Sequence, residues 1–127
     1  MRYPIFLFYD ENDVVCYESL DQLQSSLEPD DLGYIDIGIY DSDGHLFKVL
    51  EGDRAIELGA AEPTADPQRL RRLLIGALRA PGQRWATDAP LEAVISASQE
   101  AFRYEEGVPM SEAISRLLQW LRLKRPK

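Results

Sequence analysis

The stretch Pro4-Ile-Phe-Leu-Phe-Tyr9 carries apolar side chains at nearly every position. A strand with one solvated face alternates apolar and polar residues, whereas a strand covered on both faces is apolar throughout. The stretch therefore predicts a strand in the middle of a layered fold. The turn residues Asp10-Glu-Asn-Asp13 follow it, and Val14–Tyr17 is predicted to be the returning strand of a hairpin.

A short helix and three further strands are predicted in the rest of residues 1–60. Ser19, followed three residues later by Gln22, is typical of a helix N-terminus, and Pro29 is expected to end that helix. The strands are predicted over residues 33–40, 45–51 and 54–59, joined by turns at 41–44 and 52–53. The first half of the chain therefore has the element order ββαβββ.

The second half of the chain, residues 66–124, is predicted to be helical. Asp66 is a good helix N-cap, and Pro67 occupies the first helical position that proline favours. Apolar residues recur at helical spacing over residues 91–102 and again over 111–124, which indicates two further helices. Strands followed by helices are typical of an α+β fold. We therefore expect a single domain in which three helices pack on a small antiparallel sheet.

Charge divides the chain at the same place. Residues 1–66 hold sixteen Asp/Glu against three Lys/Arg, a net charge of −13, whereas residues 67–127 hold six against eleven, a net charge of +5. A strongly acidic region repels phosphate backbones and attracts basic protein surfaces. Four arginines lie between residues 69 and 79, but the whole chain carries −8, so we expect no nucleic-acid partner.

Acidic and tyrosine side chains gather at the strand ends and on one predicted strand face. Alternation over residues 33–40 predicts a strand with its isoleucines on one face and its tyrosines and aspartate on the other. Tyrosine beside aspartate is typical of protein-binding surfaces, where aromatic rings supply contact area and carboxylates steer a basic partner. The candidate partner-binding residues are Asp30, Asp31, Tyr34, Asp36, Tyr40, Asp41, Asp43, Asp53 and Glu57. The alternatives are a solvated surface without a partner, or pairing of these acids with the helical arginines.

Residues that usually build catalytic and metal sites are scarce. The single histidine, His45, follows a glycine turn and is expected to be exposed, and the single cysteine, Cys16, is expected to be buried in a strand. Asp41-Ser-Asp-Gly44 is similar to the opening of a calcium-binding loop, but Gly52 stands where the closing glutamate belongs. The sequence therefore predicts no enzyme, no metal site and no cofactor.

Signals for membrane insertion and secretion are absent from the sequence. No apolar run is long enough to cross a bilayer, and no basic region precedes an apolar stretch and a cleavage site. The lone cysteine also requires no oxidising compartment. We expect a cytoplasmic protein with no membrane partner.

Four short motifs stand out in the first half of the chain: Tyr3-Pro4-Ile5, Tyr17-Glu-Ser-Leu20, Leu27-Glu-Pro-Asp30 and Tyr40-Asp-Ser-Asp-Gly44. Together they are similar to small acidic bacterial immunity proteins, which are encoded beside polymorphic toxins of the Rhs, contact-dependent or type VI-delivered kinds. The resemblance covers the first half of the chain only. It implies a cytoplasmic, non-catalytic protein that binds one cognate toxin and blocks it, and it transfers no universal binding residue.

The expected partner is therefore a cognate protein toxin whose basic cleft the carboxylates cover. A different kind of binding module is the alternative, namely an adaptor or chaperone that grips its partner through the helical half. There Trp85 and Trp120 accompany leucine stripes, although the same residues also suit an ordinary core.

Overall fold

A five-stranded antiparallel sheet forms the centre of the protein, with two short helices between its second and third strands and two longer helices after its last strand. The computed structural model describes residues 1–52, 56–79 and 89–104. The strands are β1 (Ile5–Phe8), β2 (Val14–Tyr17), β3 (Gly38–Tyr40), β4 (Leu46–Glu51) and β5 (Ile56–Ala61), in the spatial order β2-β1-β3-β4-β5. The helices are α1 (Leu20–Ser26), the short 3₁₀ helix η1 (Pro29–Tyr34), α2 (Pro67–Arg79) and α3 (Leu91–Phe102). The predicted α+β class and the ββαβββ order are confirmed.

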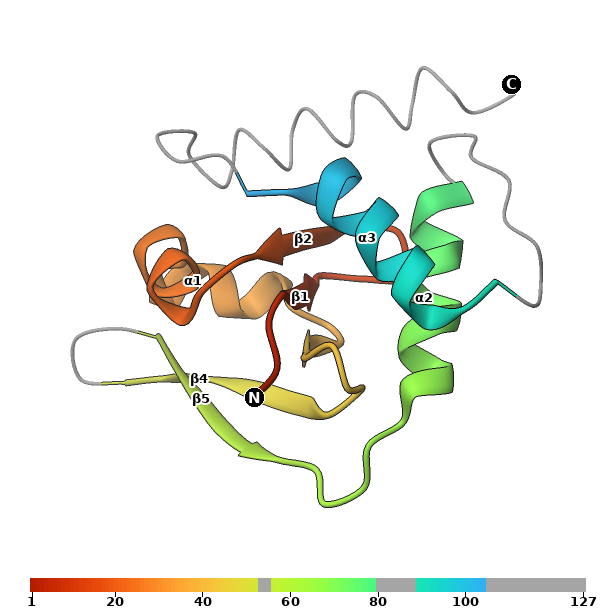
Figure 1. Cartoon of the computed structure of the whole chain (residues 1–127). Helices are drawn as coiled ribbons and strands as arrows, with labels where there is room; N and C mark the ends of the chain where they lie inside the picture. Colours follow the sequence, from red (N-terminus) through yellow and green to blue (C-terminus); the bar gives the residue numbers. More distant parts are fainter. Residues whose placement is uncertain (53–55, 80–88, 105–127) are drawn as a thin grey trace.

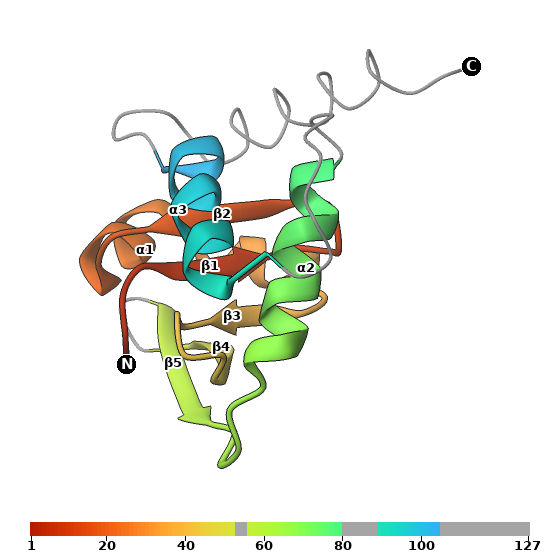
Figure 2. The same ribbon diagram turned by 45° about the vertical axis from the view of Figure 1, so that its right-hand side comes forward.

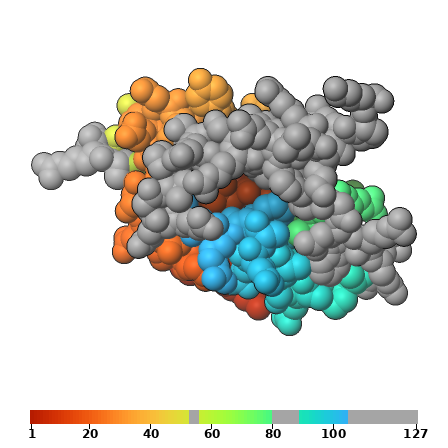
Figure 3. Space-filling model, turned by 90° about the horizontal axis from the view of Figure 1, so that it is seen from above, coloured from red at the N-terminus to blue at the C-terminus, as the bar shows by residue number. Residues whose placement is uncertain are grey.

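Helices cover both faces of the sheet. On one face, Phe6 and Phe8 of β1 belong to a buried cluster with apolar residues of α2 and α3, which lie side by side (Figures 1 and 2). On the other face, Ile5 and Leu7 pack with the buried leucines of the α1 segment. Seen from above, α3 and the orange segment of α1 and η1 lie on opposite sides of the molecule (Figure 3). All four residues of β1 are fully buried, as the apolar run predicts.

Polar side chains begin α1 and α2 where the sequence predicts. The Ser19 hydroxyl accepts the backbone N–H of Gln22 at 3.2 Å, while the Gln22 side chain accepts the N–H of Glu18 at 2.8 Å. Asp66 caps α2, since its carboxylate accepts the backbone N–H of Arg69 at 3.0 Å. Side-chain oxygens thus satisfy N–H groups that a helix start would leave unpaired. The helix predicted over residues 111–124 lies outside the described residues.

The predicted strand over residues 33–40 is wrong in its first part. Residues 29–34 form η1, and the strand β3 begins only at Gly38, whose φ of +125° lies in the region that favours glycine. This residue interrupts the two-residue alternation. Ile37 consequently packs against the α2 and α3 face, whereas Ile35 and Ile39 belong to the opposite face.

Within the described residues, no helix has the length and apolar character needed to cross a membrane.

Candidate functional site

The candidate partner-binding residues do not share one strand face. Asp30, Asp31, Tyr34 and Asp36 lie close together in sequence on η1 and the segment that follows it, while Tyr40 and Asp41 are buried, Asp43 lies in the β3–β4 turn and Glu57 is exposed on β5. Asp53 lies outside the described residues. One group of exposed candidates therefore lies on a single short segment, and it consists of Asp30, Tyr34 and Asp36.

This group is held on a fixed backbone with its side chains in solvent. Asp30 and Asp36 are exposed, and Tyr34 has 73% of its surface exposed although it is a large aromatic residue. The backbone N–H of Asp36 donates to the carbonyl oxygen of Tyr9 at 2.9 Å, which ties the segment to the end of β1. We call Asp30, Tyr34 and Asp36, with Asp10 and Glu11 of the adjoining β1–β2 turn, the acidic surface.

Asp31 has a structural role inside this segment. Its carboxylate accepts the backbone N–H of Glu28 at 2.9 Å and so closes a capping box at the start of η1. Burial raises the pKa of the Tyr9 hydroxyl, and the negative charge of Asp31 raises it further. Asp31 is therefore partly turned into the fold rather than fully presented to a partner.

Tyr40 does not belong to an exposed face. It is 1% exposed, and its ring meets that of Phe8 edge to face with the ring centroids 5.8 Å apart. It belongs to the core cluster beneath α2 and α3, and burial raises the pKa of its hydroxyl. The expectation that Tyr40 shares a surface with Tyr34 is wrong, because the turn at Gly38 separates the two residues.

Asp41 is also buried, and it organises the β3–β4 turn. One of its carboxylate oxygens accepts the backbone N–H groups of Asp43 at 3.1 Å and His45 at 2.9 Å. The other accepts the backbone N–H of Arg2 at 3.2 Å. With 1% of its surface exposed, Asp41 cannot meet a partner in this conformation, which corrects its assignment as a surface residue.

The same turn brings Asp41, Asp43 and His45 together, with one potential metal-ligand atom of each within 4.8 Å of the others. Nδ1 of His45 lies 3.3 Å from Asp41, so the histidine is a partly buried member of the turn instead of a fully exposed residue. The Arg2 guanidinium lies 3.0 Å from the Asp43 carboxylate. Hydrogen bonds and an ion pair within the protein account for this arrangement.

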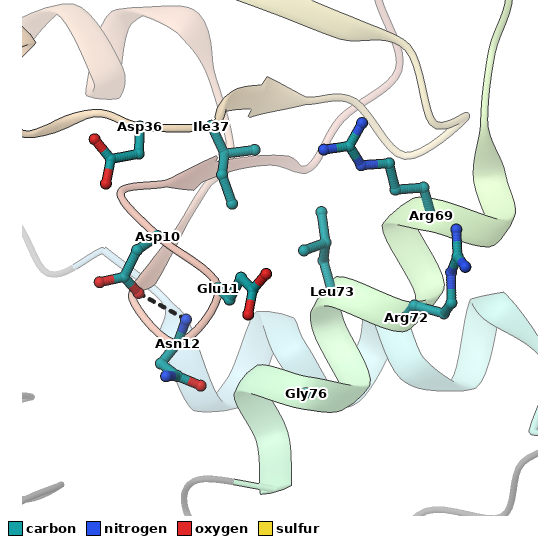
Figure 4. Close-up of a pocket in the computed structure, with 9 residues that line it drawn as sticks. All are labelled: Asp10, Glu11, Asn12, Asp36, Ile37, Arg69, Arg72, Leu73 and Gly76. Carbon is teal, nitrogen blue, oxygen red and sulfur yellow. Dashed lines mark hydrogen bonds between the residues drawn. The ribbon is translucent and has the colours of Figure 1, made fainter.

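A cleft of about 580 Å³ opens between the β1–β2 turn and α2, beside Asp36 (Figure 4). Its acidic side consists of Asp10, Glu11 and Asp36, and its basic side consists of Arg69 and Arg72. Ile37 and Leu73 form its apolar floor, and Asn12 and Gly76 complete the lining. We call it the charged cleft. In Figure 4 the Glu11 carboxylate extends toward α2, whereas the carboxylates of Asp10 and Asp36 lie on the side away from the helix.

The sequence alone does not reveal this cleft. Its acidic residues belong to a turn and a loop, which are ordinary places for acids, and its arginines belong to a helix face that solvent normally covers. The spacing of Arg69 and Arg72 by three residues indicates that they share a helix face. Only the packing of α2 beside the β1–β2 turn shows which residues they face.

Within the described residues, three exposed arginines of α2 do not pair with the acids of the strand half. Arg2 pairs with Asp43 at 3.0 Å and with Glu92 at 3.6 Å, and Nδ1 of His45 lies 3.3 Å from the Asp41 carboxylate. Arg69, Arg72 and Arg79 take part in none of them. The acidic surface therefore has no ion pair with these three arginines.

Cys16 lies in the core, as predicted. It is fully buried, and loss of solvent raises the pKa of its thiol to about 12, with the charge of Glu18 adding to the effect. A thiol of this kind remains protonated at neutral pH and makes a poor nucleophile.

No known protein family matches this sequence, and no curated protein or solved structure shows a significant match to it. The resemblance to immunity proteins therefore depends on the short motifs of the first half alone.

Proposed function

We propose that this protein is a cytoplasmic, non-catalytic inhibitor that binds a cognate bacterial toxin and neutralises it. The contact is made by the acidic surface, which covers a basic cleft of the toxin. The observation that carries the proposal is the exposed negative charge of Asp30 and Asp36, which flank Tyr34 in the sequence and make no ion pair with the described residues.

The arrangement suits the recognition of a basic protein. Tyr34 offers a large, rigid ring with a polar tip, a type of residue that often dominates the binding energy of protein interfaces. The carboxylates around it supply a field that attracts a basic surface from a distance and accelerates association. Fast association is valuable to an inhibitor that must act before the toxin reaches its substrate.

Carboxylates also resemble phosphates in the groups that they attract. A toxin that acts on an anionic substrate holds that substrate with Lys and Arg side chains, and these donate equally well to carboxylate oxygens. Acidic residues on a fixed segment can therefore occupy the positions of substrate phosphates. The ties of η1 to Glu28 and of Asp36 to β1 limit the conformational entropy lost on binding.

The surroundings of the Cys16 thiol and the His45 imidazole support a non-catalytic role. Cys16 is fully buried with a raised thiol pKa, and the Nδ1 atom of His45 faces the carboxylate of Asp41. A nucleophile and a base within hydrogen-bond reach of each other are needed for covalent catalysis. Cys16 and His45 belong to β2 and to the β3–β4 turn, and no hydrogen bond joins their side chains.

Co-expression with the product of the adjacent reading frame tests the proposal. We expect the wild-type protein to restore growth and to co-purify with that product. The variant Asp30→Lys/Asp36→Lys should lose both properties, while Glu62→Lys/Glu100→Lys, which makes the same change in net charge at exposed sites elsewhere, should retain them. Absence of both rescue and complex formation with the wild-type protein would overturn the proposal.

A further inference from the structure

The charged cleft has opposite charges on two sides, and each side belongs to an anchored stretch of backbone. On the acidic side, Asp10 is locked in its turn because its carboxylate accepts the backbone N–H groups of Asn12 at 2.7 Å and Asp13 at 2.9 Å. On the basic side, α2 is anchored in the core by the fully buried Leu70 and Leu74. Hydrogen bonds and core packing therefore hold the backbones of the two sides apart.

The arginines of the cleft make no ion pair inside the described part of the protein. Arg69 and Arg72 make no ion pair there, although three carboxylates line the same cleft. Charges held a fixed distance apart across water gain little from each other, since water screens them strongly. A ligand that brings its own charges close to each side gains more than the two sides gain from one another.

The pattern of the lining defines which ligand fits. A purely basic ligand is attracted by the acidic side and repelled by the arginines, and a purely acidic ligand meets the opposite problem. A ligand with a positive group at one end and a negative group at the other satisfies both sides. Ile37 and Leu73, which lie between them, favour an apolar middle part. The volume of about 580 Å³ is within the usual range for ligand sites.

We propose that the charged cleft binds an extended peptide segment with a basic, an apolar and an acidic side chain in that order along the cleft. The inference deepens the proposed function, on which it rests, by assigning such a segment to the partner protein. Asp36 belongs to both the acidic surface and the cleft, so a partner held by the acidic surface would reach the cleft without a gap. The basic end of the segment lies at the acidic side, where the Glu11 carboxylate extends toward α2 with Asp10 and Asp36 behind it, and its acidic end lies at Arg69 and Arg72.

Capped tetrapeptides test this chemistry without the toxin. The mixed-charge probes are Lys-Val-Val-Glu and Glu-Val-Val-Lys, and the like-charged controls are Lys-Val-Val-Lys and Glu-Val-Val-Glu. In ¹⁵N–¹H correlation spectra, at least one mixed-charge probe should shift the amides of Asn12, Ile37 and Gly76 saturably. Its affinity should exceed that of both like-charged probes by about threefold or more, the scale of one exposed ion pair.

A matched pair of charge reversals on α2 separates the cleft from general electrostatics. Arg72 lines the cleft and Arg79 does not, yet both are exposed residues of the same helix. Arg72→Glu should weaken the mixed-charge probe by about threefold to fivefold and strengthen Lys-Val-Val-Lys, while Arg79→Glu should leave both almost unchanged. Circular dichroism of each variant checks that α2 is still folded.

The outcomes are separable from those of the co-expression experiment. No saturable shift, equal affinity for all probes, or equal losses in the two variants would overturn the cleft proposal. Growth rescue that persists beside such a result would leave the acidic surface as the binding site. Peptide binding without rescue would instead support the cleft and contradict the neutralisation of a toxin.

Discussion

Asp41 offers the sharpest test of the fold around the site. Its buried carboxylate accepts three backbone N–H groups, those of Arg2, Asp43 and His45. Removing the acceptor in Asp41→Ala leaves these part-buried donors without their partner, and each lost bond costs about 1 kcal/mol. We therefore expect the free energy of unfolding to fall by about 3 kcal/mol. The effect would extend to α2, because the backbone of Gly44 in the same turn accepts the N–H of Asp66 at 2.9 Å.

Urea unfolding followed by circular dichroism measures this change. Asp43→Ala is the matched control, since it removes a carboxylate two positions away that is exposed and pairs with the exposed Arg2. Exposed ion pairs contribute little, so the control should unfold close to the wild-type midpoint. Asp41→Asn retains one oxygen as an acceptor and should fall between the two. Equal midpoints for Asp41→Ala and Asp43→Ala would refute the anchoring role of the buried carboxylate.

Three further predictions concern the interior. A Cβ on Gly44 would lie 2.6 Å from the backbone nitrogen that begins α2, and its φ is +90°, so Gly44→Ala should destabilise the protein by about 2 kcal/mol or more in urea unfolding. Gly33→Ala, which has open space, should not. Cys16 should resist iodoacetamide at pH 8 and react only after unfolding, because burial raises the pKa of its thiol to about 12. Rapid labelling of the native protein would contradict this expectation. Burial and a nearby carboxylate raise the pKa of Asp13 to about 6, above its unfolded value, so stability should fall as the pH rises from about 4 to 6. In Asp13→Asn, the urea midpoint should not fall across this pH range. A variant whose pH profile matched that of the wild type would contradict the role given to Asp13.

Short-range signals account for the parts of the fold that the sequence predicts well. The apolar run at residues 4–9 indicates a strand covered on both sides whatever lies above and below it. The pair Asp66 and Pro67 marks the first turn of α2 by side-chain and ring chemistry that acts within a few residues. Such signals need no knowledge of distant contacts.

The segment 33–40 shows where local reasoning fails. Its isoleucines alternate as they do in a strand, but Pro29 begins a 3₁₀ helix that runs to Tyr34, and Gly38 turns the chain before β3 begins. A glycine inside an alternating pattern is compatible with both a strand and a turn. The choice depends on the approach of the backbone of Phe47, since a Cβ on Gly38 would lie 2.9 Å from its carbonyl oxygen.

The candidate site was predictable in its chemistry and not in its geometry. The sequence identifies an excess of carboxylates in the first half, and the structure leaves Asp30 and Asp36 exposed. The sequence cannot show that the Asp41 side chain turns inward to accept three N–H groups. An aspartate in a turn gives the same sequence pattern whether its carboxylate faces solvent or the backbone. The charged cleft joins residues from separate parts of the chain, so only tertiary packing defines it.

The central claim is that the acidic surface guides and binds a basic protein partner, and the association rate constant tests it most directly. Stopped-flow fluorescence with the purified partner, over a range of salt concentrations, compares the wild type with Asp30→Lys/Asp36→Lys and with Glu62→Lys/Glu100→Lys. Asp31 is left intact because it caps η1.

We expect the first double variant to associate about tenfold or more slowly than the wild type at low salt, and to lose most of the salt dependence. The second should change far less, although its net charge is the same. Equal rates and equal salt dependence for the wild type and Asp30→Lys/Asp36→Lys would contradict the role assigned to the acidic surface.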